Sequence, residues 1–307
     1  RRMIGEKARN ELLDALGDRV QFDAPMSRHT SLRIGGPADA FVTPATRDEL
    51  LAVLGICRGH ALPHTIIGAG FNCLVVDEGI EGVVITLRKF RALQERPGPA
   101  IYAEAGVSHS AVTRFCADRG LAGMEFAAGI PGTVGGWIMM NAGIGVREQK
   151  DVALEVGILR PEGMGEECIG RPSLDFRYRE LRGLPDGAVV ISALFGVEES
   201  SKEAVKAEVD RLLAHRSSTQ PLDVPSCGSV FRNPEGDFAG RLIEQAGLCG
   251  ERVGGAEISP VHANFIANNG GATAADVLAL IERAQARVRK QFGVTLQREV
   301  HVMGRIE

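Results

Sequence analysis

Two glycine-rich segments have the composition of loops that bind phosphate groups. The first, Gly68-Ala69-Gly70-Phe71-Asn72, directly follows a β-prone segment at 64–67. The second lies in the uncharged stretch 126–146 and reads Gly129-Ile130-Pro131-Gly132-Thr133-Val134-Gly135-Gly136. Glycine adopts positive φ and lets the backbone approach a ligand closely, and successive backbone amides form anion-binding concavities. Two such loops predict one long ligand with a phosphate-bearing middle, which is the shape of a dinucleotide cofactor.

Other interpretations of these loops are weaker. A buried structural turn is the main alternative for either loop taken singly. A membrane span over 126–146 is disfavoured, because glycine and Pro131 are the worst helix formers. The first loop is not a Rossmann fingerprint, since its sixth position is Cys73 and residues 74–85 are strand-like rather than helical. No Gly-Lys-Ser/Thr follows it, so the sequence predicts a phosphate cradle between two strands.

Three polar segments outside the glycine loops carry further candidate residues. They are Tyr178-Arg179, the run Gly228-Ser229-Val230-Phe231-Arg232-Asn233-Pro234, and Glu299 near the C-terminus. Taken alone, each has an ordinary interpretation. Tyr178 and Arg179 form a surface pair, Ser229 is a turn hydroxyl, and Glu299 is a solvated charge. His262 is likewise interpreted as a hydrogen-bonded packing histidine.

The composition limits the classes of function. The chain has 307 residues, 44% of them hydrophobic and 24% charged, which predicts a soluble protein of two or three domains. A net charge of −4 gives no electrostatic reason to expect nucleic acid or an anionic membrane as a partner, and no obligate protein partner is evident. The six cysteines form no CxxC pair, so we expect no metal site and a reducing, cytoplasmic location. Residues 1–6 lack the apolar core of a signal peptide.

Capping residues and hydrophobic periodicity predict the elements that position these segments. Helices are expected after Thr46, from Ser108 to Gly120, after Ser200, and from Thr273 to Gly293. Strands are expected at 40–43, 65–67, 73–76, 83–87, 101–105, 152–159 and 188–197. We therefore expect mixed α/β domains at 1–88, 89–200 and 201–307.

The order of these motifs along the chain closely resembles the UDP-N-acetylenolpyruvoylglucosamine reductase family. The resemblance runs from about His29 to Glu299, and its most specific motifs are 129–136 and 228–234. It implies an α+β fold with an FAD-binding part of the vanillyl-alcohol-oxidase (PCMH) type. In this fold 1–88 and 89–200 hold FAD and 201–307 binds the substrate. The short segment between Arg179 and Ser229 resembles the subclass that lacks a tyrosine-bearing loop over the substrate.

The resemblance also implies an activity and its cofactors. The family holds FAD non-covalently, takes a hydride from NADPH, and reduces UDP-N-acetylglucosamine enolpyruvate to UDP-N-acetylmuramate for peptidoglycan. The hydride reaches the β carbon of the enolpyruvyl ether, and the α carbon must then be protonated. Two other functions are weighed against this one. One is a flavin oxidase of the same superfamily, and the other is a paralogue that senses flavin or a UDP-sugar without catalysis.

Residue roles follow from matching this sequence to the family motifs. The resemblance implies that Ser229 is the proton donor, that Arg179 pairs with the substrate carboxylate, and that Glu299 supports the enolate as a protonated acid. Contacts with the substrate are expected from Tyr178, Arg232 and Asn233. The implied FAD-binding positions are Gly68, Ala69, Gly70, Phe71, Asn72, Cys73, Leu74, Gly129, Ile130, Pro131, Gly132, Thr133, Val134, Gly135, Gly136 and Asn141.

Two positions depart from the family pattern. Phe71 stands where the family usually has a serine that can bond a phosphate, so we expect weaker FAD binding. Leu181 stands where the family usually has a serine two residues after the arginine, which removes an expected polar support for Arg179.

Overall fold

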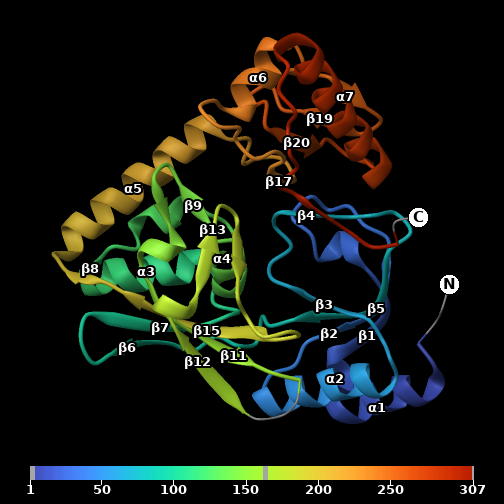
Figure 1. The fold of residues 1–307 in the computed structure, drawn as a ribbon, viewed down its shortest axis with the longest axis vertical. Coiled ribbons are helices and arrows are strands. Elements are labelled where there is room, and N and C mark those ends of the chain that lie inside the picture. The colour runs from blue at the N-terminus through green and yellow to red at the C-terminus, as the bar shows by residue number, and fades with distance from the viewer. Residues whose placement is uncertain (1–3, 162–164, 306–307) are drawn as a thin grey trace.

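The larger sheets of the described residues, each of four or five strands, form the fold together with their covering helices (Figure 1). The structure is a computed structural model that describes residues 4–161 and 165–305. We name the N-terminal, middle and C-terminal units after these sheets. The units sit at the corners of a triangle in Figure 1, and β4 (Cys73–Val75) lies where the first and last units meet.

The N-terminal unit is a four-stranded mixed sheet with two helices. Its strand order is β1 (Val20–Pro25), β2 (Pro37–Val42), β5 (Ile80–Thr86), β3 (His64–Ile67), with β2, β5 and β3 parallel. The helices α1 (Glu6–Leu16) and α2 (Arg47–Gly59) bury Leu12 and Leu50 in its core. Thr46 caps α2 as expected, because its hydroxyl accepts a hydrogen bond from the amide of Glu49 at 3.2 Å.

The middle unit is a five-stranded antiparallel sheet. Its strand order is β12 (Glu166–Gly170), β11 (Ala153–Leu159), β15 (Val189–Gly196), β7 (Ala100–Glu104), β6 (Leu93–Arg96). The helix α3 (His109–Arg119) is capped by Ser108 and ends at Gly120 with φ 67°, as the sequence predicts.

The second glycine segment is more ordered than the loop expected from its sequence. It contains a 3₁₀ turn, η3 (Glu125–Gly129), and a short helix, α4 (Val134–Met139). The close approach of α4 to the sheet explains glycine inside this helix, since a Cβ on Gly135 would lie 3.0 Å from the Cβ of Ala105. Tertiary packing therefore overrides the low helix propensity of glycine here.

The C-terminal unit pairs a small antiparallel sheet with two helices. Its strand order is β17 (Ser226–Ser229), β20 (Phe265–Asn268), β19 (Ala256–Ile258), β18 (Arg252–Val253). The helices are α6 (Ala239–Gln245) and α7 (Ala274–Phe292). α7 has the expected bounds, with a capping box between Thr273 and Asp276 and Gly293 at φ 72° after its end.

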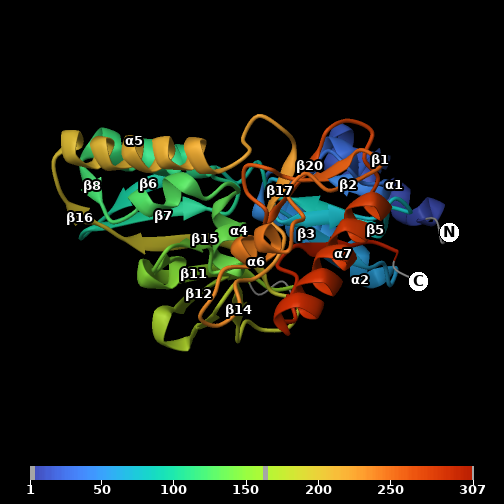
Figure 2. The same cartoon turned by 90° about the horizontal axis from the view of Figure 1, so that it is seen from above.

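One long helix connects the last two units. α5 (Lys202–Thr219) is capped by Ser201 rather than by Ser200, the expected first residue of the cap. It packs against α3 and η3 of the middle unit, and Figure 2 shows it stretched over that side of the middle sheet. The expected domain boundary at residue 200 stays a prediction. The helix that follows it, α5, packs against the middle unit, which precedes the boundary.

Short two-stranded pairs complete the arrangement. β4 pairs in parallel with β21 (His301–Met303), so the strand after the first glycine loop joins the C-terminal end of the chain and not the N-terminal sheet. The others are the hairpins β9 (Gly143–Ile144)–β10 (Arg147–Glu148) and β13 (Asp175–Arg177)–β14 (Glu180–Arg182), and the pair β8 (Leu121–Ala122)–β16 (Glu198–Glu199). No helix in the described ranges combines the length and the apolar character needed to cross a membrane.

Candidate active site

The two glycine segments are far apart in the sequence and lie in contact in the structure. A Cβ on Gly68 would be 2.8 Å from the hydroxyl oxygen of Thr133 in the second segment. Gly70 has φ 72°, and a Cβ there would be only 2.0 Å from the carbonyl oxygen of His29. Only glycine allows both the backbone conformation and these approaches.

This arrangement fits the expected FAD cradle. The two loops come from different units, and glycine at position 68 leaves room for the side chain of Thr133 from the second loop. Phe71, in the middle of the first loop, is 39% exposed and therefore in contact with solvent.

Asn72, the last residue of the first loop, joins that loop to the C-terminal unit. Its amide donates to the carbonyl of Cys227 at 3.2 Å, and its carbonyl accepts from the amide of His301 at 3.1 Å. Its side-chain amide donates to the carbonyl of Glu299 at 3.4 Å. The residue has φ 54°, a conformation that asparagine tolerates better than most residues. The first glycine loop is thereby fixed next to the segment that carries Glu299.

Ser229 and Glu299 belong to adjacent backbone segments. Ser229 ends β17, and the amide of Glu299 donates to the carbonyl of the next residue, Val230, at 2.8 Å. The Glu299 carboxyl is largely buried, and this burial raises its pKa, while the neighbouring guanidinium groups of Arg179 and Arg232 act in the opposite direction. A carboxyl in this position is more readily protonated than one in water.

Arg179 reaches this carboxyl from the middle unit. It lies at the turn of the β13–β14 hairpin with φ 58°. Its Nε donates to Glu299 Oε1 at 3.1 Å, and its Nη2 donates to the carbonyl of Gly143 at 3.2 Å. Its Nη1 is 3.6 Å from Oε1 of Glu148. The structure therefore brings together two of the three expected catalytic residues, which are 120 positions apart in the sequence.

The substitution at Leu181 has a different consequence from the one expected. Leu181 is 6% exposed and packs in the core of the middle unit. The polar support of Arg179 comes instead from Glu148 and from the Gly143 carbonyl. No local pattern singles out Glu148, because a glutamate between polar residues is usually a solvated charge.

The expected substrate residues surround the same region. The guanidinium carbon of Arg179 is 4.7 Å from the ring centroid of Tyr178, whose side chain is 42% exposed. The Nε of Arg232 is buried and has no hydrogen-bond partner among the described residues, and its charge acts on Glu299 and on His301. A buried guanidinium N–H without an acceptor can donate a hydrogen bond to an oxygen atom of a bound ligand.

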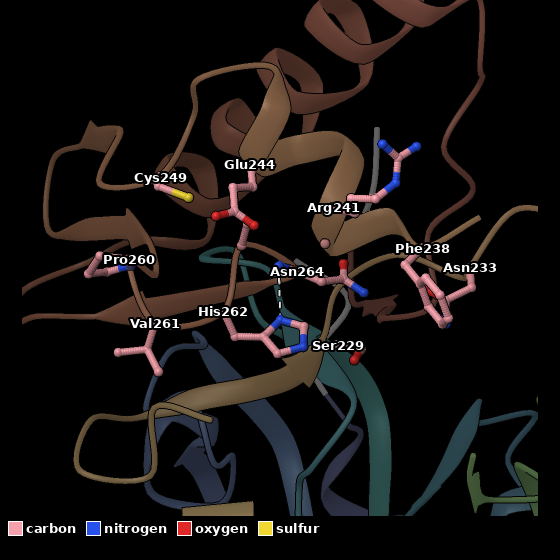
Figure 3. Close-up of a pocket in the computed structure, with 12 residues that line it drawn as sticks. Ser229, Asn233, Phe238, Arg241, Glu244, Cys249, Pro260, Val261, His262 and Asn264 are labelled. Carbon is pink, nitrogen blue, oxygen red and sulfur yellow. Dashed lines mark hydrogen bonds between the residues drawn. The ribbon is translucent and has the colours of Figure 1, made fainter. Parts of the chain in front are cut away.

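A cavity of about 400 Å³ in the C-terminal unit begins at Ser229 (Figure 3). Asn233 is at its edge, and its side-chain oxygen accepts a hydrogen bond from the amide of Ala239 at 3.0 Å. The cavity also contains polar groups that sequence reasoning did not select, namely Arg241 and Glu244 of α6.

His262 combines the expected packing role with a place in this cavity. Its Nδ1 accepts from the amide of Asn264 at 3.2 Å, and its ring is tilted against Phe265 with centroids 4.8 Å apart. Burial lowers the pKa of its imidazole. Because Nδ1 accepts a hydrogen bond, the neutral ring is assigned the tautomer with its proton on Nε2. His262 lines the cavity together with Ser229, which the sequence alone did not indicate.

Asn141, an expected FAD-binding residue, is fully buried, and its side chain bonds with the protein. Its Nδ2 donates to Glu148 Oε2 at 3.0 Å and to the carbonyl of Arg177 at 2.9 Å. Its Oδ1 accepts from the amide of Lys150 at 2.9 Å. A direct side-chain bond to a ligand would require one of these partners to be released, and the assignment to FAD stays a prediction.

Comparison with known proteins identifies the family. Residues 38–168 match the model of an FAD binding domain, and residues 220–303 match the C-terminal domain of UDP-N-acetylenolpyruvoylglucosamine reductase. Reductases of that name from Geobacter metallireducens and Geobacter sulfurreducens are 45% and 44% identical, each over 92% of this chain and 93% of the relative.

Structural comparison agrees with the sequence. The crystal structure of UDP-N-acetylenolpyruvylglucosamine reductase from Thermus caldophilus is 34% identical and matches with a TM-score of 0.78, over 91% of this chain and 97% of that one. The expected fold, an FAD-binding part followed by a C-terminal substrate domain, is confirmed by these matches. The chain belongs to the UDP-N-acetylenolpyruvoylglucosamine reductase family.

Proposed function

We propose that this flavin-dependent oxidoreductase reduces UDP-N-acetylglucosamine enolpyruvate to UDP-N-acetylmuramate with hydride from NADPH, and that Arg179, Glu299 and Ser229 carry out the chemistry on the substrate. FAD, when bound, carries the hydride from NADPH to the substrate. One observation supports the assignment most strongly. Arg179 pairs with Glu299, whose backbone is bonded to that of Val230 next to Ser229 and, through Asn72, to the first glycine loop.

The carboxylate end of the substrate is assigned to Arg179. When a hydride adds to the β carbon, the electron pair of the double bond moves toward the α carbon and its carboxylate. A guanidinium beside that carboxylate stabilises the added charge. Glu299 in its protonated form donates a hydrogen bond to the same oxygens, and its raised pKa supports this role. A neutral Glu299 also leaves the charge of Arg179 available to the substrate.

Protonation of the α carbon is assigned to Ser229. The hydroxyl proton moves to the α carbon, and solvent then restores the hydroxyl. The serine lies at the edge of the cavity and next to the segment of Glu299, so it can reach both a bound substrate and water. Its neighbours must assist, because a serine hydroxyl is a poor acid in water.

The nucleotide part of the substrate is assigned to the region beyond Ser229. Asn233 at the cavity edge supports this placement, and so does the buried Nε of Arg232, for which the described residues offer no hydrogen-bond acceptor. Tyr178 lies beside Arg179 and is assigned to the carboxylate end. We place the reaction in the cytoplasm. The six cysteines are all free, which supports a reducing compartment.

The alternative functions lack such support. An oxidase of the same superfamily needs no proton donor for a substrate enolate, and a sensor needs no protonated acid beside an arginine. The product distinguishes the reductase from both alternatives, because only the reductase converts the enolpyruvyl substrate into a compound that is heavier by two hydrogens.

A serine variant tests the assignment. Ser229→Ala is expected to preserve reduction of the flavin by NADPH and to stop reduction of the substrate, followed by stopped-flow absorbance and by mass spectrometry of the product. Ser226→Ala, on the same strand, is the matched control and is expected to behave as the wild type. Loss of both half-reactions in Ser229→Ala, with flavin content intact, would show that the residue is not the proton donor.

A further inference from the structure

Glu148, at the end of β10, makes polar contacts with several groups near the candidate active site. Its Oε2 accepts a hydrogen bond from Asn141 at 3.0 Å and lies 2.6 Å from the Nζ of Lys150. Its Oε1 is 3.6 Å from Nη1 of Arg179. The side chain is only 13% exposed, so this ion pair is screened much less than one on the surface. The Glu148 side chain also caps the 3₁₀ turn that follows it by accepting from the backbone amide of Asp151. Beyond its contact with Arg179, no part in the reaction has been assigned to this carboxylate.

The two carboxylate oxygens of Glu148 have different partners. Asn141 and Lys150 hold Oε2, so that Oε1 faces the guanidinium. Asn141 is fully buried and also bonds to the carbonyl of Arg177 on the hairpin that carries Arg179. The same amide therefore fixes both the carboxylate and the backbone two residues before the arginine.

The neighbouring hairpin is shaped around this carboxylate. A Cβ on Gly143 would lie 2.6 Å from Cγ of Glu148 and 2.4 Å from the carbonyl of Arg147, so glycine lets Glu148 fold back over β9. The carbonyl of Gly143 accepts from Nη2 of Arg179. Both hairpins belong to the middle unit in Figure 1, and the bond from Arg179 to Gly143 joins them.

We propose that Glu148 is a positioning residue for Arg179 and holds the guanidinium between its own carboxylate and that of Glu299. The inference rests on the proposed function, because it assigns Arg179 to the substrate carboxylate. Glu148 binds one edge of the guanidinium and Glu299 binds Nε, so the arginine keeps its orientation when a substrate displaces the contact with Glu299. Glu148 itself touches neither substrate nor cofactor in this account.

The arrangement has an electrostatic consequence at Glu299. The charged groups that act on Glu299 are Arg179 and Arg232, and Arg232 also acts on His301. Glu148 shares Arg179 with Glu299 and adds a negative charge nearby. Without the charge of Glu148, Arg179 stabilises the ionised form of Glu299 more strongly, and the pKa of Glu299 falls. The activity that depends on protonated Glu299 is then lost at a lower pH.

The test uses the full-length protein with FAD bound. Glu148→Gln keeps the size of the side chain and an acceptor for Asn141, and removes the charge. We expect a loss of about tenfold to a hundredfold in the rate of substrate reduction, as for other losses of orientation near a reacting group. Flavin reduction by NADPH is expected to be unchanged, and the alkaline limb of the kcat/KM profile is expected to move to lower pH.

A double-mutant cycle separates positioning from general structural damage. In the Arg179→Lys background, Glu148→Gln is expected to have almost no further effect, because the group that it positions is already gone. Asp175→Asn is the matched control. It removes a carboxylate that pairs with Arg177 at 2.7 Å on the same hairpin, with the aspartate side chain 44% exposed, and it should leave all rates unchanged.

Each outcome has a distinct meaning. Equal losses in both half-reactions, effects that add to those of Arg179→Lys, or an unshifted pH profile would overturn the inference. If Glu148→Gln does not fold, Glu148→Asp decides, because it keeps the charge but withdraws it from Nη1 and should still slow substrate reduction selectively. A wild type that does not reduce the substrate would sink the proposed function itself, whereas an active wild type with a fully active Glu148→Gln would sink only the role of Glu148.

Discussion

Replacing Arg179 by lysine keeps the positive charge and removes the planar geometry. Three nitrogens of the guanidinium make separate contacts, with Glu299 at 3.1 Å, the Gly143 carbonyl at 3.2 Å and Glu148 at 3.6 Å. A lysine ammonium is a single point of charge on a flexible stem and cannot span these three directions. The remaining charge would be free to move away from the substrate carboxylate.

The size of the effect follows from the interactions lost in the transition state. A preorganised charged donor at a developing anion contributes roughly 3 kcal/mol, so Arg179→Lys should slow substrate reduction on the order of a hundredfold. Flavin reduction by NADPH should change less than about twofold, because the arginine is assigned only to the substrate step.

Stopped-flow absorbance of the flavin measures the two steps separately. Arg177→Lys is the matched control, since Arg177 lies on the same hairpin with its side chain 64% exposed and pairs only with Asp175 among the ion pairs found in the described residues. The reasoning is refuted if Arg179→Lys reduces the substrate at the wild-type rate, or if Arg177→Lys is impaired to the same extent.

Three further predictions concern the cofactor loop and stability. Phe71→Ser should tighten FAD binding several-fold in a fluorescence titration of apoprotein, because the serine hydroxyl can bond a phosphate. Phe71 is 39% exposed, so the loss of its ring costs little packing. Unchanged affinity would show that the backbone amides suffice. Gly70→Ala should weaken FAD retention and lower the unfolding temperature, because its Cβ would lie 2.0 Å from a carbonyl oxygen. Gly98→Ala is the control, since Gly98 has a similar φ but open space around it, and this variant carries only the conformational cost of a positive φ. Glu49→Gln should lower the free energy of unfolding by about 1 kcal/mol at neutral pH, because hydrogen bonds from Arg19 lower the pKa of Glu49 to about 2 and solvent screens part of this gain. That contribution is present above the unfolded pKa and is lost as the pH falls toward 2, so equal differences between the two proteins at pH 7 and pH 2 in urea unfolding would contradict it.

Local signals in the sequence predict much of the fold. Thr46, Ser108 and Thr273 cap their helices because each hydroxyl reaches an amide three residues away, an interaction set by adjacent residues alone. The glycine loops are also detectable, since positive φ and close backbone approach require glycine. The helix inside the second loop is not, because its contact with Ala105 is a tertiary interaction.

The contacts of the candidate site could not be read from local patterns. Arg179 and Glu299 are 120 residues apart, and β4 and β21 lie at distant positions in the chain. Their proximity depends on how three sheets pack, and no periodicity encodes that. Leu181 illustrates the same limit. Its sequence context predicts a loss of polar support, and only the structure identifies Glu148 as the group that supports Arg179.

An anaerobic two-step spectrum tests the central claim most directly. The protein with FAD bound is first reduced with NADPH, and UDP-N-acetylglucosamine enolpyruvate is then added without oxygen. We predict that the flavin colour bleaches in the first step and returns in the second, with UDP-N-acetylmuramate as the product. Bleaching without recovery would contradict the assigned substrate and favour the oxidase, and failure to take up FAD at all would contradict the cradle formed by the two glycine loops.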